Sequence, residues 1–309
     1  MYSIIFYTIV TENYLCFAET LRDSFLKNNI NIDFKICLIN DKSKNNINYN
    51  SEIITTDVLD FDKYESMRQR YDNLSLVCAL KPYFADYFLK EEKVTSIVYL
   101  DADILVYNKF DYLIDLLNND SDQSSIILTS HVLNKLGVDN MVRNINYLTY
   151  GTYNAGFFAI KNNKHGNVFI QWWKELLYNY CKDDLSKGIF YDQSWLNLVP
   201  NYFYHYYTLL THPGYNVAYW NIDERDLSKK NNIYFCQQQP LVFYHFARFN
   251  YYDKGTTKNI EKINPLMVEI FQNYRIELKN NGIENHIEEN KQKKNSYIDQ
   301  LRKYLKIKK

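Results

Sequence analysis

The sequence lacks the features that mark several common protein classes. Its 309 residues contain five scattered cysteines, none of which forms a CxxC pair. This usage argues against a structural zinc site or a disulfide framework and suits a reducing cytoplasm. The 36 basic and 36 acidic residues balance, so the chain has no net charge that would attract nucleic acid. We therefore expect a cytoplasmic protein with no nucleic-acid partner.

Long apolar runs and a glycine-rich loop are also missing. Residues 1–10 lack the basic start and apolar core of a secretion signal, and no window approaches the ~20 apolar residues that a membrane-spanning helix requires. The segment TIVTENY, residues 8–14, contains no glycine. Because a nucleotidyltransferase normally carries a Gly-rich phosphate loop near its first strand, this segment disfavours that class.

Strand and helix patterns alternate along most of the chain. Buried strand patterns occupy residues 3–10, 33–39, 97–100, 125–130, 155–160 and 240–246, and helical patterns occupy roughly 15–27, 74–89 and 169–181. A strand, a helix and a strand at this spacing predict parallel strands with right-handed crossovers. From about Lys254 onward the sequence becomes helical and highly charged. We expect an α/β domain over residues 1–255 and a basic helical extension over residues 256–309.

Two aspartates follow the most hydrophobic strand. Asp101 and Asp103 come directly after Ile97–Leu100 and are separated by Ala102. In extended backbone, residues i and i+2 point the same way, so the two carboxylates can converge on one site. A carboxylate beside an apolar interior is costly unless it is paired or bound to a cation, and two hard oxygen donors suit Mg²⁺ or Mn²⁺. The alternative is that one aspartate caps the next turn and the other is solvated.

Four segments, in this order, resemble segments of glycosyltransferase family 8 and its bacterial relatives. They are YLDADILVYNKFDYLIDL around the two aspartates, YNAGFFAI at 153–160, YDQSWLN around Asp192 and Gln193, and FYHFA around His245. The resemblance spans roughly residues 1–250. It implies a GT-A domain, which is Rossmann-like with a mixed, mostly parallel sheet flanked by helices. CALKPYFADYFL, the Trp172–Trp173 pair and PGYNVAYWN at 213–221 are similar to a bacterial branch found in surface-polysaccharide gene sets.

The resemblance implies an activity and a set of site residues. The activity is metal-dependent transfer of a hexose from a nucleotide diphosphate sugar, by resemblance a UDP-sugar, with retention, to a glycan or lipid-linked acceptor. The implied residues are Asp101, Asp103 and His245 as ligands of Mn²⁺ or Mg²⁺, Asn154, Asp192 and Gln193 at the reacting sugar, and Thr11, Asn13, Tyr14, Lys81, Ala102, Ala155, Gly156 and Arg248 around the donor. Aromatic stacking makes Tyr14 the candidate to hold the base.

Several of these residues have plainer interpretations. Asn154 and Gly156 are also suited to the start of a strand, Asp192 to a helix N-cap, His245 to a core position and Tyr14 to simple packing. Two positions depart from the family pattern: Ala79 replaces an arginine two residues before Lys81, and Arg248 replaces a glycine that a lysine normally follows. A non-catalytic carbohydrate-binding protein and a sugar nucleotidyltransferase remain as rival classes.

The end of the chain is strongly basic. Residues 291–309 contain eight basic residues against Asp299 alone, with Tyr297, Ile298, Leu301, Tyr304 and Leu305 at helical spacing. This pattern predicts a basic amphipathic helix, which is suited to peripheral contact with an anionic membrane surface. A solvated terminal helix or a packed lid is the alternative.

Overall fold

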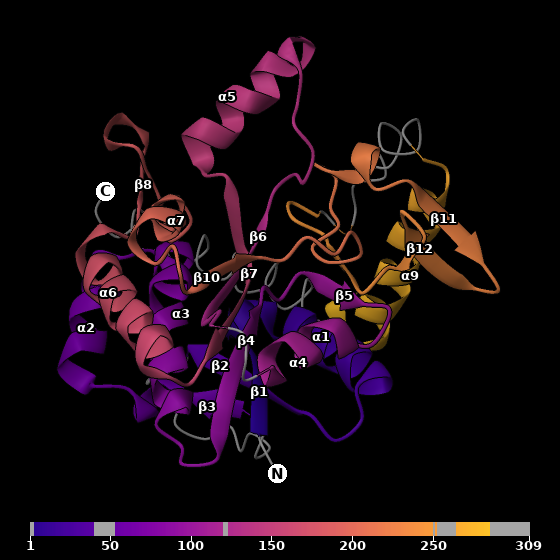
Figure 1. Ribbon diagram of the computed structural model, residues 1–309. Helices are drawn as coiled ribbons and strands as arrows, with labels where there is room; N and C mark the ends of the chain where they lie inside the picture. Colours follow the sequence, from indigo (N-terminus) through magenta and orange to yellow (C-terminus); the bar gives the residue numbers. More distant parts are fainter. Residues whose placement is uncertain (1–2, 40–52, 120–122, 250, 252–263, 285–309) are drawn as a thin grey trace, which may run out of the picture.

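A seven-stranded sheet forms the centre of the protein, for which a computed structural model describes residues 3–39, 53–119, 123–249, 251 and 264–284 (Figure 1). The strand order is β10-β6-β7-β4-β1-β2-β3. The strands are β1 (Ser3–Thr11), β2 (Asp33–Ile39), β3 (Ile53–Thr55), β4 (Val94–Leu100), β6 (Ile126–Ser130), β7 (Tyr153–Lys161) and β10 (Tyr207–Leu209).

The sheet is mixed and mostly parallel, as the sequence predicts. β1 is parallel to β2 and β4, β2 to β3 and β10 to β6. β7 alone runs antiparallel, to both β4 and β6. The first residues of β7 therefore lie at the sheet edge where β1 and β4 end. This edge is the one at which open α/β sheets bind ligands.

Helices cover both faces of the sheet. They are α1 (Leu15–Asn28), α2 (Phe61–Arg70), α3 (Asn73–Leu89), α4 (Asp111–Asn118), α5 (Met141–Tyr150), α6 (Lys164–Tyr180), α7 (Val199–Tyr202) and α9 (Leu266–Asn280). Alternate residues of β1 point to opposite faces: Tyr7 packs with Phe88 of α3, whereas Phe6 packs with Phe25 of α1. Trp173 of α6 belongs to the same buried cluster as Tyr7. Figure 1 shows α2, α3 and α6 on one side of the sheet and α1 and α4 on the other.

The predicted single strand over residues 240–246 is wrong. The chain forms β13 (Gln239–Pro240) and β14 (Phe243–His245), which belong to different small sheets. β13 pairs with β12 (Ile233–Cys236), which also pairs with β11 (Leu227–Lys230), while β14 pairs antiparallel with β5 (Ile104–Val106). The strand divides because the backbone N–H of Leu241 donates to Tyr234 and that of Val242 donates to Gly214.

Short elements complete the connections. They are the strands β8 (Asp183–Asp184) and β9 (Ile189–Phe190) and the 3₁₀ turns η1 (Glu12–Tyr14), η2 (Thr56–Val58), η3 (Val138–Asn140), η4 (Leu185–Lys187), η5 (Ser194–Leu198) and η6 (Ile222–Glu224). The C-terminal helix predicted from the sequence is present as α9, which packs Ile270 and Phe271 against Tyr244 and Phe246. Residues 291–309 lie outside the described residues. Within the described ranges, no helix has the length and apolar character needed to cross a bilayer.

Candidate active site and metal centre

A cleft of about 530 Å³ opens at the edge of the sheet where β1 and β4 end. We call it the first cleft. Most of the residues singled out from the sequence line it: Thr11, Asn13, Tyr14, Lys81, Asp101, Ala102, Asp103, Ala155, Gly156, Asp192 and Gln193. Asn154 and Arg248 line a neighbouring cleft instead. The fold thus brings residues from distant parts of the chain to one edge of the sheet.

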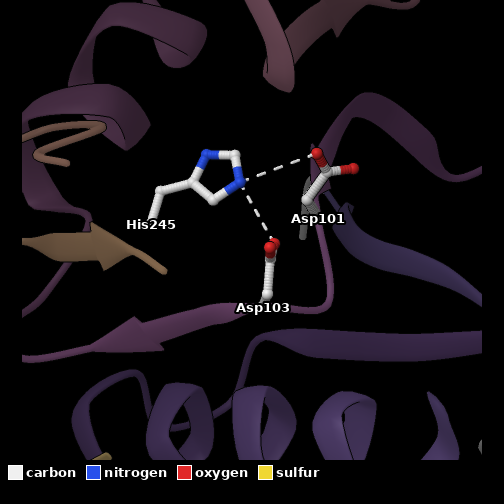
Figure 2. A group of neighbouring side chains, drawn as sticks. All are labelled: Asp101, Asp103 and His245. Carbon is white, nitrogen blue, oxygen red and sulfur yellow. Dashed lines mark ion pairs between the residues drawn. The ribbon is translucent and has the colours of Figure 1, made fainter. Parts of the chain in front are cut away.

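Asp101, Asp103 and His245 form a compact group beside the first cleft (Figure 2). One ligand atom from each residue lies within 4.8 Å of the others. His245 Nε2 is 3.1 Å from Asp103 Oδ1 and 3.8 Å from Asp101 Oδ2. Asp101 follows β4, Asp103 precedes β5, and β14 carries His245 beside β5. The pairing of β14 with β5 is therefore what brings the histidine to the two carboxylates.

The hydrogen bonds of Asn216 orient the His245 imidazole. The Asn216 amide NH₂ donates to Thr129 Oγ1 at 2.9 Å and to Asn154 Oδ1 at 3.2 Å. Its carbonyl oxygen therefore faces His245, whose Nδ1–H donates to it at 3.2 Å. Nε2 is left to face the carboxylates. Burial lowers the pKa of His245, but Asp103 and then Asp101 outweigh burial and raise it.

Gly156 is required by the crowding of these side chains. A Cβ at this position would lie 2.4 Å from His245 Cε1 and 2.8 Å from both Asp101 Oδ2 and Asn154 Oδ1. Real Cβ atoms essentially never approach heavy atoms this closely. The glycine in β7 therefore marks a close approach, as glycine in a strand often does. In this structure, the side chains that approach the Gly156 backbone are those of Asp101, Asn154 and His245.

Lys81 is a buried cation held between two carboxylates. Its Nζ lies 2.9 Å from Asp192 Oδ2, 3.0 Å from the Ala155 carbonyl oxygen and 3.3 Å from Asp101 Oδ1. Burial lowers the pKa of Lys81, but Asp101 and Asp192 outweigh it and raise the pKa. The Ala155 carbonyl oxygen accepts a hydrogen bond from the Lys81 ammonium, and the Asp192 and Asp101 carboxylates form ion pairs with it. The geometry makes Lys81 a residue that positions Asp101 and Asp192.

Asp101 carries further hydrogen bonds. Tyr99 donates its hydroxyl to Asp101 Oδ1 at 2.7 Å, and the Asp101 backbone N–H donates to the Gly156 carbonyl at 2.8 Å. Burial raises the pKa of Asp101, but Lys81 and then His245 outweigh burial and lower it. These contacts hold Asp101 as a carboxylate. Its other oxygen, Oδ2, is directed toward His245.

Asp192 does not cap the turn that follows it. The N-cap of η5 is Gln193, and no side chain forms a capping bond there. The Asp192 side chain is 4 % exposed and pairs with Lys81, while its backbone carbonyl accepts from Trp173 Nε1 at 3.3 Å. Burial raises the pKa of Asp192, and Lys81 opposes this effect. The N-cap interpretation of Asp192 is wrong, and one tryptophan of the Trp172–Trp173 pair supports this residue.

Gln193 lies at the junction of two clefts. Its Oε1 accepts from the Ala155 backbone N–H at 3.2 Å and from Asn154 Nδ2 at 3.3 Å, and its Nε2 donates to the Tyr150 carbonyl at 2.8 Å. Gln193 and Phe190 line both the first cleft and a second cleft of about 620 Å³. The side-chain amide of Gln193 is therefore held in the wall that the two clefts share.

Aromatic and polar side chains surround the second cleft. His131, Arg143, Tyr147, Tyr150, Tyr219, Trp220, Asp223 and Arg248 are among its lining residues. His131 stacks on Tyr147 at 5.4 Å between ring centroids, and burial lowers its pKa to about 4, which keeps the imidazole neutral near pH 7. Arg248 is exposed and has φ of 61°, a left-handed conformation that glycine adopts without strain.

Three supporting residues were not singled out from the sequence. Asn216 links His245 to Asn154, Tyr99 donates to Asp101, and His131 lies beside Asn154 in the second cleft. Asn216 lies in PGYNVAYWN, a segment whose resemblance to a bacterial branch of the family assigns no role to its single residues. Its φ of 50° is a conformation that asparagine tolerates better than most residues. The signal available in the sequence was an asparagine in the turn-prone segment that begins with Pro213 and Gly214.

Comparisons with known proteins identify the fold. No protein-family model matches the chain. The chain is 25% identical over 216 residues to the uncharacterized protein YfnF of Bacillus subtilis (strain 168), covering 67% of this chain and 68% of the relative. It is 27% identical over 101 residues to the uncharacterized protein YfnD of the same strain, about a third of each chain (32%).

Among solved structures, the galactosyltransferase LgtC, in complex with donor and acceptor sugar analogs, is similar with a TM-score of 0.50. The match has 12% sequence identity and covers 85% of this chain and 94% of that one. The chain has the GT-A fold. At this level of identity, the likeness concerns the arrangement of the chain, and the chemistry must be argued from the site.

Proposed function

We propose that this protein is a metal-dependent glycosyltransferase resembling those of family 8. Its donor would be a nucleotide diphosphate sugar, in our proposal a UDP-hexose, and transfer would retain configuration. Its acceptor would be a glycan or a lipid-linked glycan in surface-polysaccharide synthesis. The observation that carries the proposal is the Asp101–Asp103–His245 group beside a cleft large enough for a nucleotide sugar, within a GT-A fold.

The donor set fits a divalent cation. Two carboxylates and an imidazole nitrogen suit Mn²⁺ or Mg²⁺, and the Nδ1–H bond to Asn216 leaves His245 Nε2 as the ligand atom. The Lys81 ammonium pairs with Asp101 and Asp192, and Asp103 lies beside His245 as a third carboxylate of this neighbourhood, so three carboxylates accompany one ammonium. When bound, the ion would act as a Lewis acid that stabilises charge on the departing diphosphate.

The residues of the first cleft divide between the two ends of a donor. Thr11, Asn13 and Tyr14 would hold the base, with Tyr14 stacking on it. Ala102, Ala155 and Gly156 line the cleft near the metal group, where backbone can approach a diphosphate and sugar closely. Asp192 would accept from sugar hydroxyls. Gln193, whose carbonyl oxygen is fixed by Asn154 and Ala155, would stabilise positive charge on the reacting sugar.

The second cleft is the proposed acceptor site. It shares Phe190 and Gln193 with the first cleft, and in our proposal an acceptor hydroxyl there attacks the sugar on the side of the leaving diphosphate. Its aromatic side chains, including Tyr147, Tyr219 and Trp220, offer the apolar faces on which sugar rings pack. Front-face attack of this kind is how transfer would retain configuration.

The decisive test is hydrolysis of a panel of UDP-sugars with Mn²⁺ and without acceptor. A glycosyltransferase slowly releases UDP and free sugar, and we expect Asp103→Asn to abolish this release. Asp115→Asn, an exposed carboxylate on α4, is the matched control and should leave the release unchanged. The proposal fails if no UDP-sugar is hydrolysed, or if Asp103→Asn hydrolyses as fast as Asp115→Asn.

The same assay separates the two rival classes. A sugar nucleotidyltransferase would release pyrophosphate from a nucleoside triphosphate and a sugar phosphate. A carbohydrate-binding protein would release neither product. For a glycosyltransferase we expect Asn154→Ala to slow the release of UDP by about tenfold or more.

A further inference from the structure

The helix α5 presents an apolar face to solvent. It lies in the connection between β6 and β7, and Figure 1 shows it standing out from the body beyond the edge of the sheet. Five apolar side chains on α5 and the preceding turn η3 are between 50% and 78% exposed: Val138, Met141, Val142, Ile145 and Leu148. The spacing of the four on α5 places them on one side of the helix. We call this set the α5 apolar face.

The opposite side of α5 is fixed to the second cleft. Arg143 forms two hydrogen bonds to the Asp223 carboxylate, at 2.6 and 3.2 Å, and a third to the Trp220 carbonyl. Tyr147 also donates to the Trp220 carbonyl, at 3.3 Å. These bonds set the rotation of the helix about its axis. The α5 apolar face is therefore held outward, beside the cleft that we propose for the acceptor.

A second copy of the chain is a poor match for this face. α5 has 10 residues and, at 1.5 Å per residue, is about 15 Å long. Its face is about 10 Å wide, so one helix presents several-fold less area than the about 800 Å² per partner that a stable protein interface buries. Binding to a bilayer surface requires no minimum interface area, because each apolar side chain that enters the lipid contributes its own burial free energy.

Charge does not oppose docking on lipid. The charged residues between Val138 and Tyr150 are Asp139 and Arg143, and Arg143 is paired with Asp223, so the α5 apolar face has one neighbouring carboxylate for anionic headgroups to repel. The eight basic residues of 291–309 would add attraction to the same kind of surface. We propose that the α5 apolar face docks on an anionic lipid surface and holds the second cleft against it. The docking itself does not depend on the proposed function. Its purpose, to reach a lipid-linked acceptor, rests on that function.

Vesicle flotation tests the docking. The intact chain should float with vesicles of phosphatidylcholine and phosphatidylglycerol, and Val142→Asp/Leu148→Asp should lower the bound fraction by about tenfold. The matched control is Ile30→Asp/Ile276→Asp, because these isoleucines are 78% and 57% exposed elsewhere on the surface. The control should bind like the unaltered chain. Failure of the intact chain to bind, or equal loss in both variants, overturns the proposal.

A fluorescent label identifies what covers the face. The five native cysteines are buried, so Leu148→Cys provides an accessible thiol for an environment-sensitive dye. We expect a blue shift only when vesicles are added. A shift without vesicles that grows with protein concentration would indicate a second copy. A concentration-independent shift that is lost on deleting residues 285–309 would indicate the chain's own C-terminal segment. Either result overturns lipid docking.

The hydrolysis assay keeps the two proposals distinguishable. Val142 and Leu148 line neither cleft, so Val142→Asp/Leu148→Asp should hydrolyse UDP-sugars without vesicles as fast as the unaltered chain does. A chain that floats but hydrolyses no UDP-sugar would refute the proposed function and leave the docking intact. A chain that hydrolyses but does not float would refute the docking alone.

Discussion

Helix α3 contributes to two charged clusters, and the two are built differently. The outer cluster is centred on Asp86, whose carboxylate accepts from Gln171 at 2.7 Å, Lys174 at 2.6 Å and Lys90 at 2.9 Å. The inner cluster is centred on Lys81, which faces Asp101 and Asp192, with Asp103 and His245 just beyond. The outer cluster has one carboxylate and two ammonium groups, whereas the inner cluster has three carboxylates, one ammonium and the imidazole of His245.

The difference separates a structural cluster from a site. Every oxygen of Asp86 has a protein donor, so the outer cluster needs nothing further. The inner cluster retains excess negative charge beside an open cleft, and Asp101 and Asp103 are still 30% and 28% exposed. Two charged clusters to which one helix contributes can thus differ in kind, and only the inner one is suited to bind a cation.

The largest expected difference between the clusters is in the unfolding free energy lost when one lysine is removed from each. Lys81→Met leaves Asp101 and Asp192 without their shared partner, and breaking a buried pair in this way costs about 3 kcal/mol or more of unfolding free energy. Lys174→Met leaves Asp86 with Lys90 and Gln171 and should cost less than about 1 kcal/mol. Urea unfolding in EDTA measures both. UDP-sugar hydrolysis should be lost in Lys81→Met alone.

A double variant shows whether charge is the cause. Lys81→Met/Asp192→Asn removes one of the two stranded carboxylates and should recover part of the lost stability. If it is no more stable than Lys81→Met, or if Lys81→Met costs no more than Lys174→Met, the distinction between the two clusters is wrong.

Asn216 offers the next test, because it connects the metal group to Asn154. Asn216→Ala leaves His245 Nδ1 without its acceptor and Asn154 Oδ1 with the Gly156 backbone N–H as its remaining donor. Loss of such a supporting bond to a metal-ligating histidine typically weakens metal binding by about 10- to 100-fold. Titration calorimetry with Mn²⁺ alone measures the affinity. Asn162→Ala is the control, since Asn162 donates to the Leu89 and Val94 carbonyls away from the cleft. Equal weakening in both variants would make Asn216 merely structural.

The fold was largely predictable from the sequence, whereas the connections within the site were not. Short buried runs and their order predicted the central sheet, and Asp101 and Asp103 stood out because they follow such a run. Lys81 did not reveal its buried position, because a lysine within an apolar helix looks the same whether or not carboxylates surround it. The link from Asn216 to Asn154 joins residues 62 apart in sequence, so only the folded chain defines it.

Substitutions of Arg248 should have smaller effects. They separate the contribution of its side chain to the rate of transfer from the cost of its backbone conformation to stability. We propose that its guanidinium contacts the donor diphosphate, which predicts that Arg248→Ala lowers the rate of transfer by about tenfold and that Arg248→Lys recovers part of the loss. Arg248→Gly should lose the rate equally but gain up to about 1 kcal/mol in unfolding free energy, because φ is 61°. A raised acceptor KM with unchanged UDP-sugar hydrolysis would instead make Arg248 an acceptor residue of the second cleft.

The smallest expected effect is a difference in pH dependence between Asp86 and Asp192. Burial raises the pKa of Asp86, but the hydrogen bonds from Lys174, Lys90 and Gln171 outweigh burial and lower it. Its contribution to stability is therefore full above the unfolded-state pKa of about 3.9 and is lost as pH falls through the lower folded pKa. Asp86→Asn should cost about 1 kcal/mol at pH 7, and this difference from the unaltered chain should shrink below about pH 4.

Asp192 should show the opposite slope. Because burial raises its pKa above the unfolded value despite Lys81, the folded chain binds the proton more tightly than the unfolded chain. Its contribution is therefore most favourable at low pH and declines as pH rises above about 4 toward the folded pKa. Relative to Asp86→Asn, the unaltered chain should gain stability as pH rises toward about 4. Relative to Asp192→Asn, it should lose stability as pH rises above about 4. Urea unfolding of the three proteins in EDTA between pH 3 and pH 7 measures both slopes, and slopes of the same sign would show that the inner carboxylate is as well satisfied as the outer one.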